Sequence, residues 1–205
     1  LEMTRRAVMG RMALSECNLN HLSLTPSDDE RLTHTAHTLA QYPIAICHDP
    51  GLRVGEIGRE SREMERTLGG LDVILIDHIG YIPHEGEPGD SKAARIGNTT
   101  KALTRLAKSM QVAVLCLSQL RRSDYDAAKA PDLDDLRESG DLEQDARQVW
   151  MLHRPGYYAP FAEKPDQTAP QKALVIVRKN HNGPRDISIP LAFVEQSAKF
   201  AEWSQ

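Results

Sequence analysis

The strongest strand signal in the sequence is Leu71-Asp72-Val73-Ile74-Leu75-Ile76-Asp77. Its centre holds four consecutive β-favouring or bulky apolar residues, Val73 to Ile76, and an acid ends the run. Half-buried strands alternate apolar and polar residues, whereas strands of a parallel sheet that is covered on both faces are apolar throughout. The stretch therefore predicts a central strand that is buried on both faces.

Helical and strand patterns alternate on either side of this strand, which is typical of an α/β domain with a mostly parallel sheet. The last two expected strands, near the C-terminal end of the sequence, are expected to form a β-hairpin. Helix-stop signals support the helical assignments, since Pro43 and Gly69-Gly70 each follow a periodic stretch. The expected helices cover residues 4–16 with Thr4 as N-cap, a stretch ending at Pro43 with Ser27 and Glu30 as a capping box, residues 54–68, and residues 96–110. The other expected strands cover residues 44–48, 112–118, 148–153 and 173–178, and the hairpin covers 187–194 and 198–203.

Composition narrows the class of protein. The chain has 205 residues with 40% hydrophobic and 26% charged residues, so it can bury a core and fold. No apolar run approaches the roughly 18 residues that span a membrane, and the first residues lack the apolar stretch of a signal peptide. The three cysteines show no metal-ligand spacing, which favours a reducing, cytoplasmic setting. The formal net charge of −4 excludes a uniformly basic protein but not a local basic channel.

Two strand ends carry polar residues of chemical interest. Asp77 ends the strand of residues 71–77, at the edge of an open α/β sheet where ligands bind, and its carboxylate can hold Mg²⁺, usually through water. Gln119 follows the strand of residues 112–118, where an amide can sense a γ-phosphate or orient a water molecule. Taken singly, each also fits an ordinary strand-to-loop junction.

A dense charged run extends from Asp134 to Asp145. One interpretation is a solvated loop that leads into a capped helix, with Ser139 or Asp141 as the cap. The other is a loop that presents backbone N–H groups and Arg137 to a phosphodiester backbone. Arg121 and Arg122, after the second strand, fit either a DNA-facing basic spot or a solvated loop.

Together these features resemble the C-terminal motor domain of DnaB-type replicative helicases, which are RecA-like P-loop NTPases. The resemblance runs from Leu1 to about Phe200 and is most specific in the charged run. The matching segments are Leu1-Glu2-Met3, Leu75-Ile76-Asp77-His78, Leu117-Ser118-Gln119-Leu120, Leu133 to Asp145, and Lys179-Asn180-His181-Asn182-Gly183-Pro184.

The resemblance implies a RecA-like fold, with helices on both faces of a mostly parallel central sheet, and a role for each matching position. Glu2 is implied as the catalytic base that polarises water, Asp77 as the Mg²⁺ carboxylate and Gln119 as the γ-phosphate sensor. Arg11 is implied to pack on the nucleotide base. The implied trans-acting residues are Lys179 and His181, and the implied DNA contacts are Arg137, Glu138 and Gly140. Contacts to phosphates predict sequence-tolerant, salt-sensitive binding.

The chain departs from the family pattern in two places. No Gly is followed by Lys, so the Gly-Lys-Ser/Thr phosphate-binding loop is missing, together with the first strand of the sheet. In the family that loop precedes the Leu1-Glu2-Met3 motif, so residues 1–205 are expected to be a single, partial motor domain that is inactive alone. Second, His181 stands where the family has an arginine finger. One interpretation is that stimulation of ATP hydrolysis in the neighbouring subunit is weak or altered. The other is that His181 is an ordinary turn residue, and that Lys179, Arg178 or Arg185 contacts the neighbouring subunit's nucleotide.

The resemblance implies an ATP- and Mg²⁺-dependent helicase that unwinds DNA 5′ to 3′ as a homohexameric ring on single-stranded DNA, with a primase and a helicase loader as partners. ATP would be hydrolysed between subunits. The alternative is a truncated, ATPase-inactive relative that binds DNA or a helicase ring. A RecA-like ATPase of recombination or regulation is a third interpretation, against which the Arg137-to-Asp145 segment argues.

Overall fold

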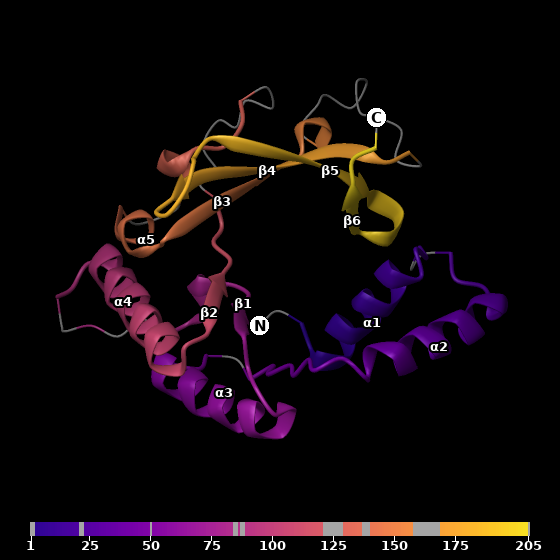
Figure 1. Cartoon of the computed structure of the whole chain (residues 1–205), viewed down its shortest axis with the longest axis horizontal. Helices are drawn as coiled ribbons and strands as arrows, with labels where there is room; N and C mark the ends of the chain where they lie inside the picture. Colours follow the sequence, from indigo (N-terminus) through magenta and orange to yellow (C-terminus); the bar gives the residue numbers. More distant parts are fainter. Residues whose placement is uncertain are drawn as a thin grey trace. The chain divides into compact units, whose positions relative to one another are not determined.

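The computed structural model describes residues 3–20, 23–49, 51–83, 86, 89–120, 129–136, 140–157 and 169–204. The chain forms two compact units, which are described one at a time (Figure 1). Unit 1 comprises Leu1–Arg5, Pro43–Arg121 and Leu133–Arg147. Unit 2 comprises Arg6–Tyr42, Arg122–Asp132 and Gln148–Gln205.

Unit 1 is built on two parallel strands, as predicted. Ile76 of β1 (Val73–Ile76) lies beside Cys116 of β2 (Ala113–Cys116), and the pairing keeps this register along both strands. A helix joins β1 to β2, because parallel neighbours need a crossover connection, and another helix precedes β1. These helices are α3 (Val54–Leu68) and α4 (Lys92–Met110), and the short α5 (Gly140–Asp145) packs on α4.

The core of unit 1 lies between one face of these strands and the helices. Its fully buried members are Ile79, Ile82, Ile96 and Leu103. The strands contribute Ile76, Val114 and Cys116, while α3 contributes Val54 and Ile57. The predicted stop of α3 is confirmed, since Gly69 adopts the left-handed conformation (φ 79°) directly after the helix. Helix α4 ends at Met110 as predicted but begins at Lys92, four residues before the predicted start.

The opposite face of the two strands is exposed, so the prediction of a strand buried on both faces is wrong for the part of unit 1 that is described. Val73 is 52% exposed and Leu75 is 61% exposed. An apolar run indicates that a strand can be buried on both faces, but it does not specify which helix or sheet packs against each face. The core of unit 1 packs against the face that carries Ile76, Val114 and Cys116.

The described residues of unit 2 form a four-stranded antiparallel sheet in the order β3-β4-β5-β6 and two α-helices. The predicted closing hairpin is confirmed, with Phe193 of β5 paired to Phe200 of β6 and their ring centroids 4.8 Å apart. Parallel pairing among the described residues is therefore confined to β1 and β2, within a protein of the predicted α/β class. The strands are β3 (Gln148–His153), β4 (Gln171–Asn180), β5 (Ile187–Val194) and β6 (Lys199–Glu202), and the helices are α1 (Arg5–Glu16) and α2 (Asp29–Leu39).

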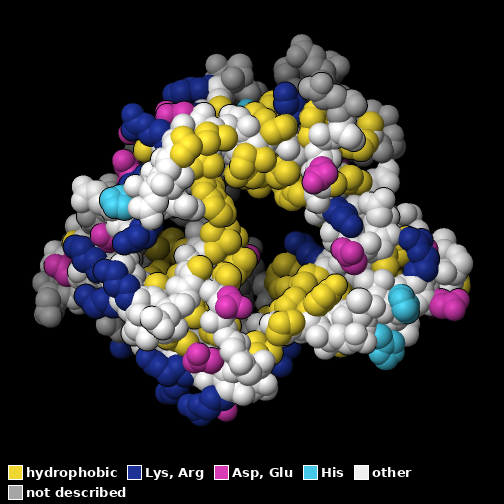
Figure 2. All heavy atoms as spheres, viewed as in Figure 1, with side chains coloured by type: hydrophobic (Ala, Val, Ile, Leu, Met, Phe, Trp, Pro, Cys, Tyr) yellow, Lys and Arg dark blue, Asp and Glu magenta, His cyan; other side chains and the backbone are white. Residues whose placement is uncertain are grey.

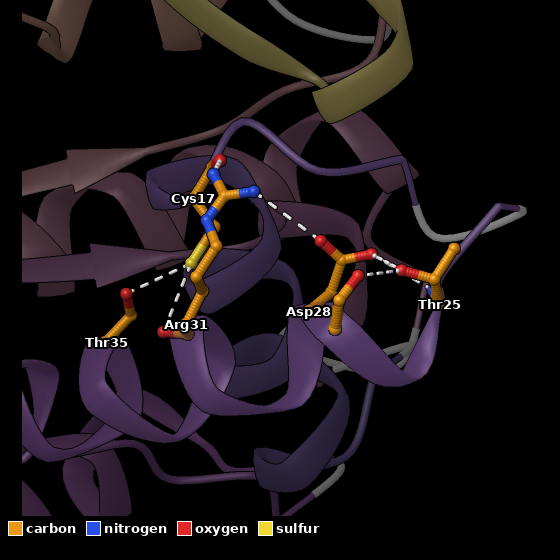
Figure 3. A network of polar contacts seen from close by, with 6 residues as sticks. Cys17, Thr25, Asp28, Arg31 and Thr35 are labelled. Carbon is orange, nitrogen blue, oxygen red and sulfur yellow. Dashed lines mark hydrogen bonds and ion pairs between the residues drawn. The ribbon is translucent and has the colours of Figure 1, made fainter.

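The capping box lies two residues before the predicted pair of Ser27 and Glu30, since Thr25 and Asp28 cap the 3₁₀ turn Pro26–Asp28 that leads directly into α2. Thr25 donates from both its amide (3.0 Å) and its hydroxyl (2.7 Å) to Oδ2 of Asp28 (Figure 3). These hydrogen bonds lower the pKa of the Asp28 carboxyl. Arg31 extends the network, since it donates to the carbonyl of Cys17 (2.8 Å), at the end of α1.

The predicted strand at residues 44–48 is wrong, because these residues form no strand. Ile44 is 46% exposed, and the carbonyl of Ile46 accepts a hydrogen bond from Arg5 Nε (2.9 Å) instead of a strand partner. A short apolar run becomes a strand only where a neighbouring edge supplies ladder hydrogen bonds. No described segment pairs with it.

Buried His153 on β3 predicts acid sensitivity. Burial lowers the pKa of its imidazole below the unfolded value of about 6.5. The unfolded chain therefore binds the proton first as pH falls. The contribution of neutral His153 to the free energy of unfolding should be fully present above about pH 7. It should decrease below about pH 6.5, with a slope of at most about 1.4 kcal/mol per pH unit. Urea unfolding at two pH values should show this contribution, which His153→Leu removes. His34→Gln, an exposed histidine on α2, should leave the slope unchanged.

Candidate functional site

The first cluster of predicted residues lies at the carboxyl ends of β1 and β2. The parallel register continues beyond both strands, because Leu117 N donates to Ile76 O (2.9 Å) and Ile79 N donates to Leu117 O (3.0 Å). Asp77 follows Ile76 and Gln119 follows Leu117 by two residues, so the two leave the same edge of the sheet. Both side chains are exposed. A carboxylate and an amide are thus presented to a ligand at one sheet edge.

His78 shapes the turn directly after Asp77. Its Nδ1 accepts a hydrogen bond from the amide of Gly80 (3.0 Å), and its ring packs against Tyr81 with centroids 4.6 Å apart. A Cβ at position 80 would lie 2.7 Å from the His78 ring, so glycine is required for this close approach. The chain beyond Asp77 is therefore folded back, and the carboxylate stays exposed at the strand end.

A thiol near this edge does not compete for a metal. Cys116 ends β2 and faces the core of unit 1, where burial raises the pKa of its thiol to about 12. It is therefore uncharged at neutral pH, and only thiolates bind metals well. Among the described residues, no three His, Cys, Asp or Glu side chains form a metal-binding group.

The segment after Gln119 pairs with the segment before Arg137. Leu120 and Leu136 form an isolated antiparallel bridge. Beyond the undescribed residues 137–139, α5 begins at Gly140, and its last residue, Asp145, accepts a hydrogen bond from Thr100 of α4. Main-chain pairing and this side-chain contact thus hold both ends of the charged run against the core of unit 1. Neither contact follows from the spacing of residues in the sequence.

Several predicted site residues lie outside the described residues. Glu2, Arg121, Arg122, Arg137 and Glu138 belong to this group. Their roles stay predictions from the resemblance. The bridge at Leu136 and the start of α5 at Gly140 do fix the residues that border Arg137 and Glu138 in sequence.

Lys179 and His181 belong to unit 2, at the turn between β4 and β5. His181 is exposed and Lys179 is half-buried. Asn180 braces the turn, because its Oδ1 accepts from Asn182 N (3.4 Å) and its Nδ2 donates to Pro184 O (3.3 Å). The same Oδ1 accepts from Gln148 of β3 (3.3 Å). The turn therefore projects residue 181 into solvent on a supported backbone.

Arg178 is held within its own subunit. Its Nε donates to the carbonyl of buried Pro131 (2.9 Å) and lies 3.8 Å from an Asp132 oxygen. Its Nη1 donates to Asp186 (3.2 Å), and the side chain is only 18% exposed. These contacts attach the segment that precedes the charged run to β4. Arg185, by contrast, is 77% exposed, with one Asp186 oxygen 3.7 Å away.

Arg11, the predicted base-packing residue, lies on α1 in unit 2 with an exposed side chain. The end of this helix is attached to the closing hairpin, because Ser197 Oγ donates to Asn18 Oδ1 (2.7 Å) and Lys199 lies 3.5 Å from Glu16.

No described helix is long and apolar enough to cross a membrane.

A parallel strand pair with an acid and an amide at its carboxyl ends is typical of RecA-like helicase ATPase domains, and the chain belongs to this class. One solved structure of an ATPase domain matches 99% of this chain and 72% of its own length, with 26% identity and a TM-score of 0.86. A DnaB-like replicative helicase, solved for its interactions with primase, matches 99% of this chain with a TM-score of 0.85 and 26% identity, over 49% of its own length. The model of the DnaB-like helicase C terminal domain matches residues 1–202, and the chain belongs to this family.

Curated relatives agree with this assignment. The chain is 34% identical to the replicative DNA helicase DnaC of Bacillus subtilis over 208 aligned residues. It is 32% identical to the replicative DNA helicase DnaB of Geobacillus stearothermophilus over 206 aligned residues. Each alignment covers 98% of this chain and 44% of the relative, so the chain spans less than half the length of these helicases.

Proposed function

We propose that this chain is the motor part of a replicative DNA helicase that hydrolyses ATP between the subunits of a homohexameric ring and unwinds DNA 5′ to 3′. Single-stranded DNA would occupy the ring, with a primase and a helicase loader as partners. The family assignment supports the helicase class. The connection between the sheet edge and the charged run supports the coupling of hydrolysis to DNA.

One observation carries the proposal: the bridge between Leu120 and Leu136. Leu120 directly follows Gln119, the proposed γ-phosphate sensor, and Leu136 directly precedes Arg137, a proposed DNA contact. A main-chain pairing transmits a displacement without depending on side-chain rotamers. Movement at the nucleotide end of β2 would thus reach the DNA-contacting run through two adjacent residues.

The residues at the sheet edge fit MgATP. The exposed carboxylate of Asp77 supplies the hard oxygen ligand that Mg²⁺ prefers, directly or through water, and the amide of Gln119 can bond a phosphate oxygen. Glu2 is proposed to polarise the attacking water, and Arg11 to pack on the base. Bound Mg²⁺ would neutralise the charge that develops on the phosphates.

The contacts of the β4–β5 turn narrow the choice of trans-acting residue. Arg178 is engaged by Pro131, Asp132 and Asp186, so it is a poor candidate for reaching a neighbouring subunit. We propose that Lys179 and His181 carry that role, with exposed Arg185 as the remaining guanidinium at the turn. A guanidinium would offer a charged fork that an imidazole lacks.

The DNA contacts are proposed for Arg137, Glu138 and Gly140, with Arg121 and Arg122 as further basic residues. Such contacts would go to phosphates, and each phosphate contact that is lost should lower the salt dependence of binding. Binding should then tolerate any base sequence, because phosphates carry no sequence information.

The experiment that tests the proposal measures ATP hydrolysis and strand unwinding by the full-length protein, with and without single-stranded DNA. We expect hydrolysis that DNA stimulates, and unwinding of a fork with a 5′ tail. If the full-length protein binds DNA but hydrolyses no ATP, the binding-module alternative is correct instead.

His181→Arg tests the trans contact. If residue 181 reaches the neighbouring nucleotide, the arginine should raise DNA-stimulated hydrolysis by about tenfold or more, because arginine fingers contribute at least that much to phosphoryl transfer. Asn182→Arg, one residue further along the same exposed turn, provides the matched control and should have little effect. An unchanged rate for His181→Arg would exclude the finger role.

A further inference from the structure

Helices α3 and α4 of unit 1 form the walls of an open groove with a volume of about 890 Å³. Among the described residues, four cationic side chains line it, Arg53 and Arg62 from the α3 side and Lys101 and Arg105 from α4, against the one carboxylate of Asp90. Figure 2 shows Lys and Arg side chains gathered over these two helices. The chain as a whole carries a net charge of −4, so this concentration of positive charge is local.

The positive charge of α4 is not balanced within the helix. Its 19 residues include five cations and no acid, and Lys101 and Arg105 are one turn apart on the same side. Neither forms an ion pair with another described residue, and neither does Arg62, whose Nη1 donates only to the Gly58 carbonyl of its own helix (3.2 Å). Like charges held this close repel one another, so an anion that enters the groove should relieve the repulsion.

The start of α3 adds hydrogen-bond donors to the groove. Val54 and Gly55, the first two residues of the helix, both line it, and their amides donate to no other described residue. The next two amides, of Glu56 and Ile57, are already bonded to Arg53 O (2.9 Å each). A Cβ at Gly55 would meet nothing within 4 Å, so this amide surface is open. Helix N-termini with free amides favour phosphate.

The lining distinguishes phosphate from other anions. Among the described residues that line the groove none is aromatic, so bases would find no stacking surface there. Its apolar lining consists of Val54, Pro83, Ala102 and Leu106, and Leu106 is only 7% exposed. An amphipathic acidic helix would therefore bury little apolar surface there. Arginine forks and free amides match phosphate oxygens instead.

We propose that this groove is a second phosphate-binding site, which takes the phosphates of a single-stranded nucleic acid or of a free polyphosphate. It uses none of the residues proposed for ATP or for the DNA loops, so it does not depend on the proposed function. Contacts would go to phosphate oxygens only, and the site would not read base sequence.

The test uses the full-length protein with its nucleotide sites filled by ADP, and compares oligothymidylate, tripolyphosphate and polyglutamate. Hydrogen exchange should show protection of residues 53–62 and 98–106 by a phosphate ligand. The variant K101Q/R105Q should weaken that ligand by about tenfold. The control R59Q/K108Q also removes one arginine and one lysine, from positions on α3 and α4 that do not line the groove. It should change the affinity by less than about twofold.

The outcomes separate the sources and the alternatives. Protection by tripolyphosphate alone identifies a free polyphosphate. Protection by oligothymidylate, with a salt slope that K101Q/R105Q reduces by about 1.4, identifies a nucleic acid strand. The proposal is wrong if neither phosphate ligand protects these residues, if the control variant loses as much affinity, or if polyglutamate protects them equally well. Arg105→Lys, which keeps the charge, should retain most of the affinity and shows that the groove remains folded.

Discussion

Replacing Asp77 with Asn in the full-length protein should lower the rate of ATP hydrolysis by about 100-fold or more. The substitution keeps the shape of the side chain but removes its negative charge. At this exposed strand end, the charge is proposed to hold Mg²⁺, which stabilises the charge that develops on the phosphates by several kcal/mol. Hydrolysis at a series of Mg²⁺ concentrations is the measurement, and the variant should also need more Mg²⁺ for half-maximal rate.

Asp72→Asn is the matched control. Asp72 is exposed and directly precedes β1, so it lies at the opposite end of the same strand. Its carbonyl, which the substitution leaves in place, accepts a hydrogen bond from Ala113 N (2.9 Å). Hydrolysis by this variant should remain close to that of the original protein. If both substitutions reduce the rate equally, Asp77 has no special role.

Replacing Ile96 with Ala should lower the free energy of unfolding by about 2–5 kcal/mol. Ile96 is 3% exposed and packs with Ile79, Ile82 and Leu103, so truncation leaves a cavity where α4 meets the turn that follows Asp77. Urea unfolding followed by circular dichroism measures the loss. Ile79 and Ile82 lie just beyond Asp77, so the cavity should also loosen the support of the sheet edge.

Ile44→Ala removes the same atoms from an exposed site. Ile44 is 46% exposed and belongs to no strand. Its loss should cost less than about 1 kcal/mol, because little apolar surface leaves the interior. Equal losses at positions 44 and 96 would mean that residues 44–48 are buried in the protein in solution, as the sequence pattern first indicated.

Much of the fold follows from local patterns. The helices at 54–68 and 96–110 and the closing hairpin are predicted by apolar periodicity and by stop signals such as Gly69. The adjacency of Asp77 and Gln119 is also predictable, because parallel strands end at the same sheet edge. The capping box before α2 cannot be placed from the sequence, because Thr25 with Asp28 and Ser27 with Glu30 have the same spacing, and only the structure shows which pair bonds.

The contacts that hold the site together could not be predicted in this way. Arg178 bonds a carbonyl 47 residues away, and Thr100 bonds a carboxylate 45 residues away. Periodicity reports which face of an element is apolar, but it carries no information on which distant segment supplies a partner. The exposure of Val73 and Leu75 has the same origin, since the need for a cover is encoded locally and the cover itself is not.

Because the side chain of Asn180 supports the backbone of the β4–β5 turn, the residue at position 181 can be exchanged without loss of that support. The backbone there is held by the side chain of residue 180 and by the flanking strands, and the hydrogen bonds of this brace do not involve the side chain of His181. Substitutions at position 181 should therefore change chemistry without changing the scaffold. A series of side chains placed on this one position becomes a calibrated probe, in which differences in rate measure reach, charge and donor geometry alone.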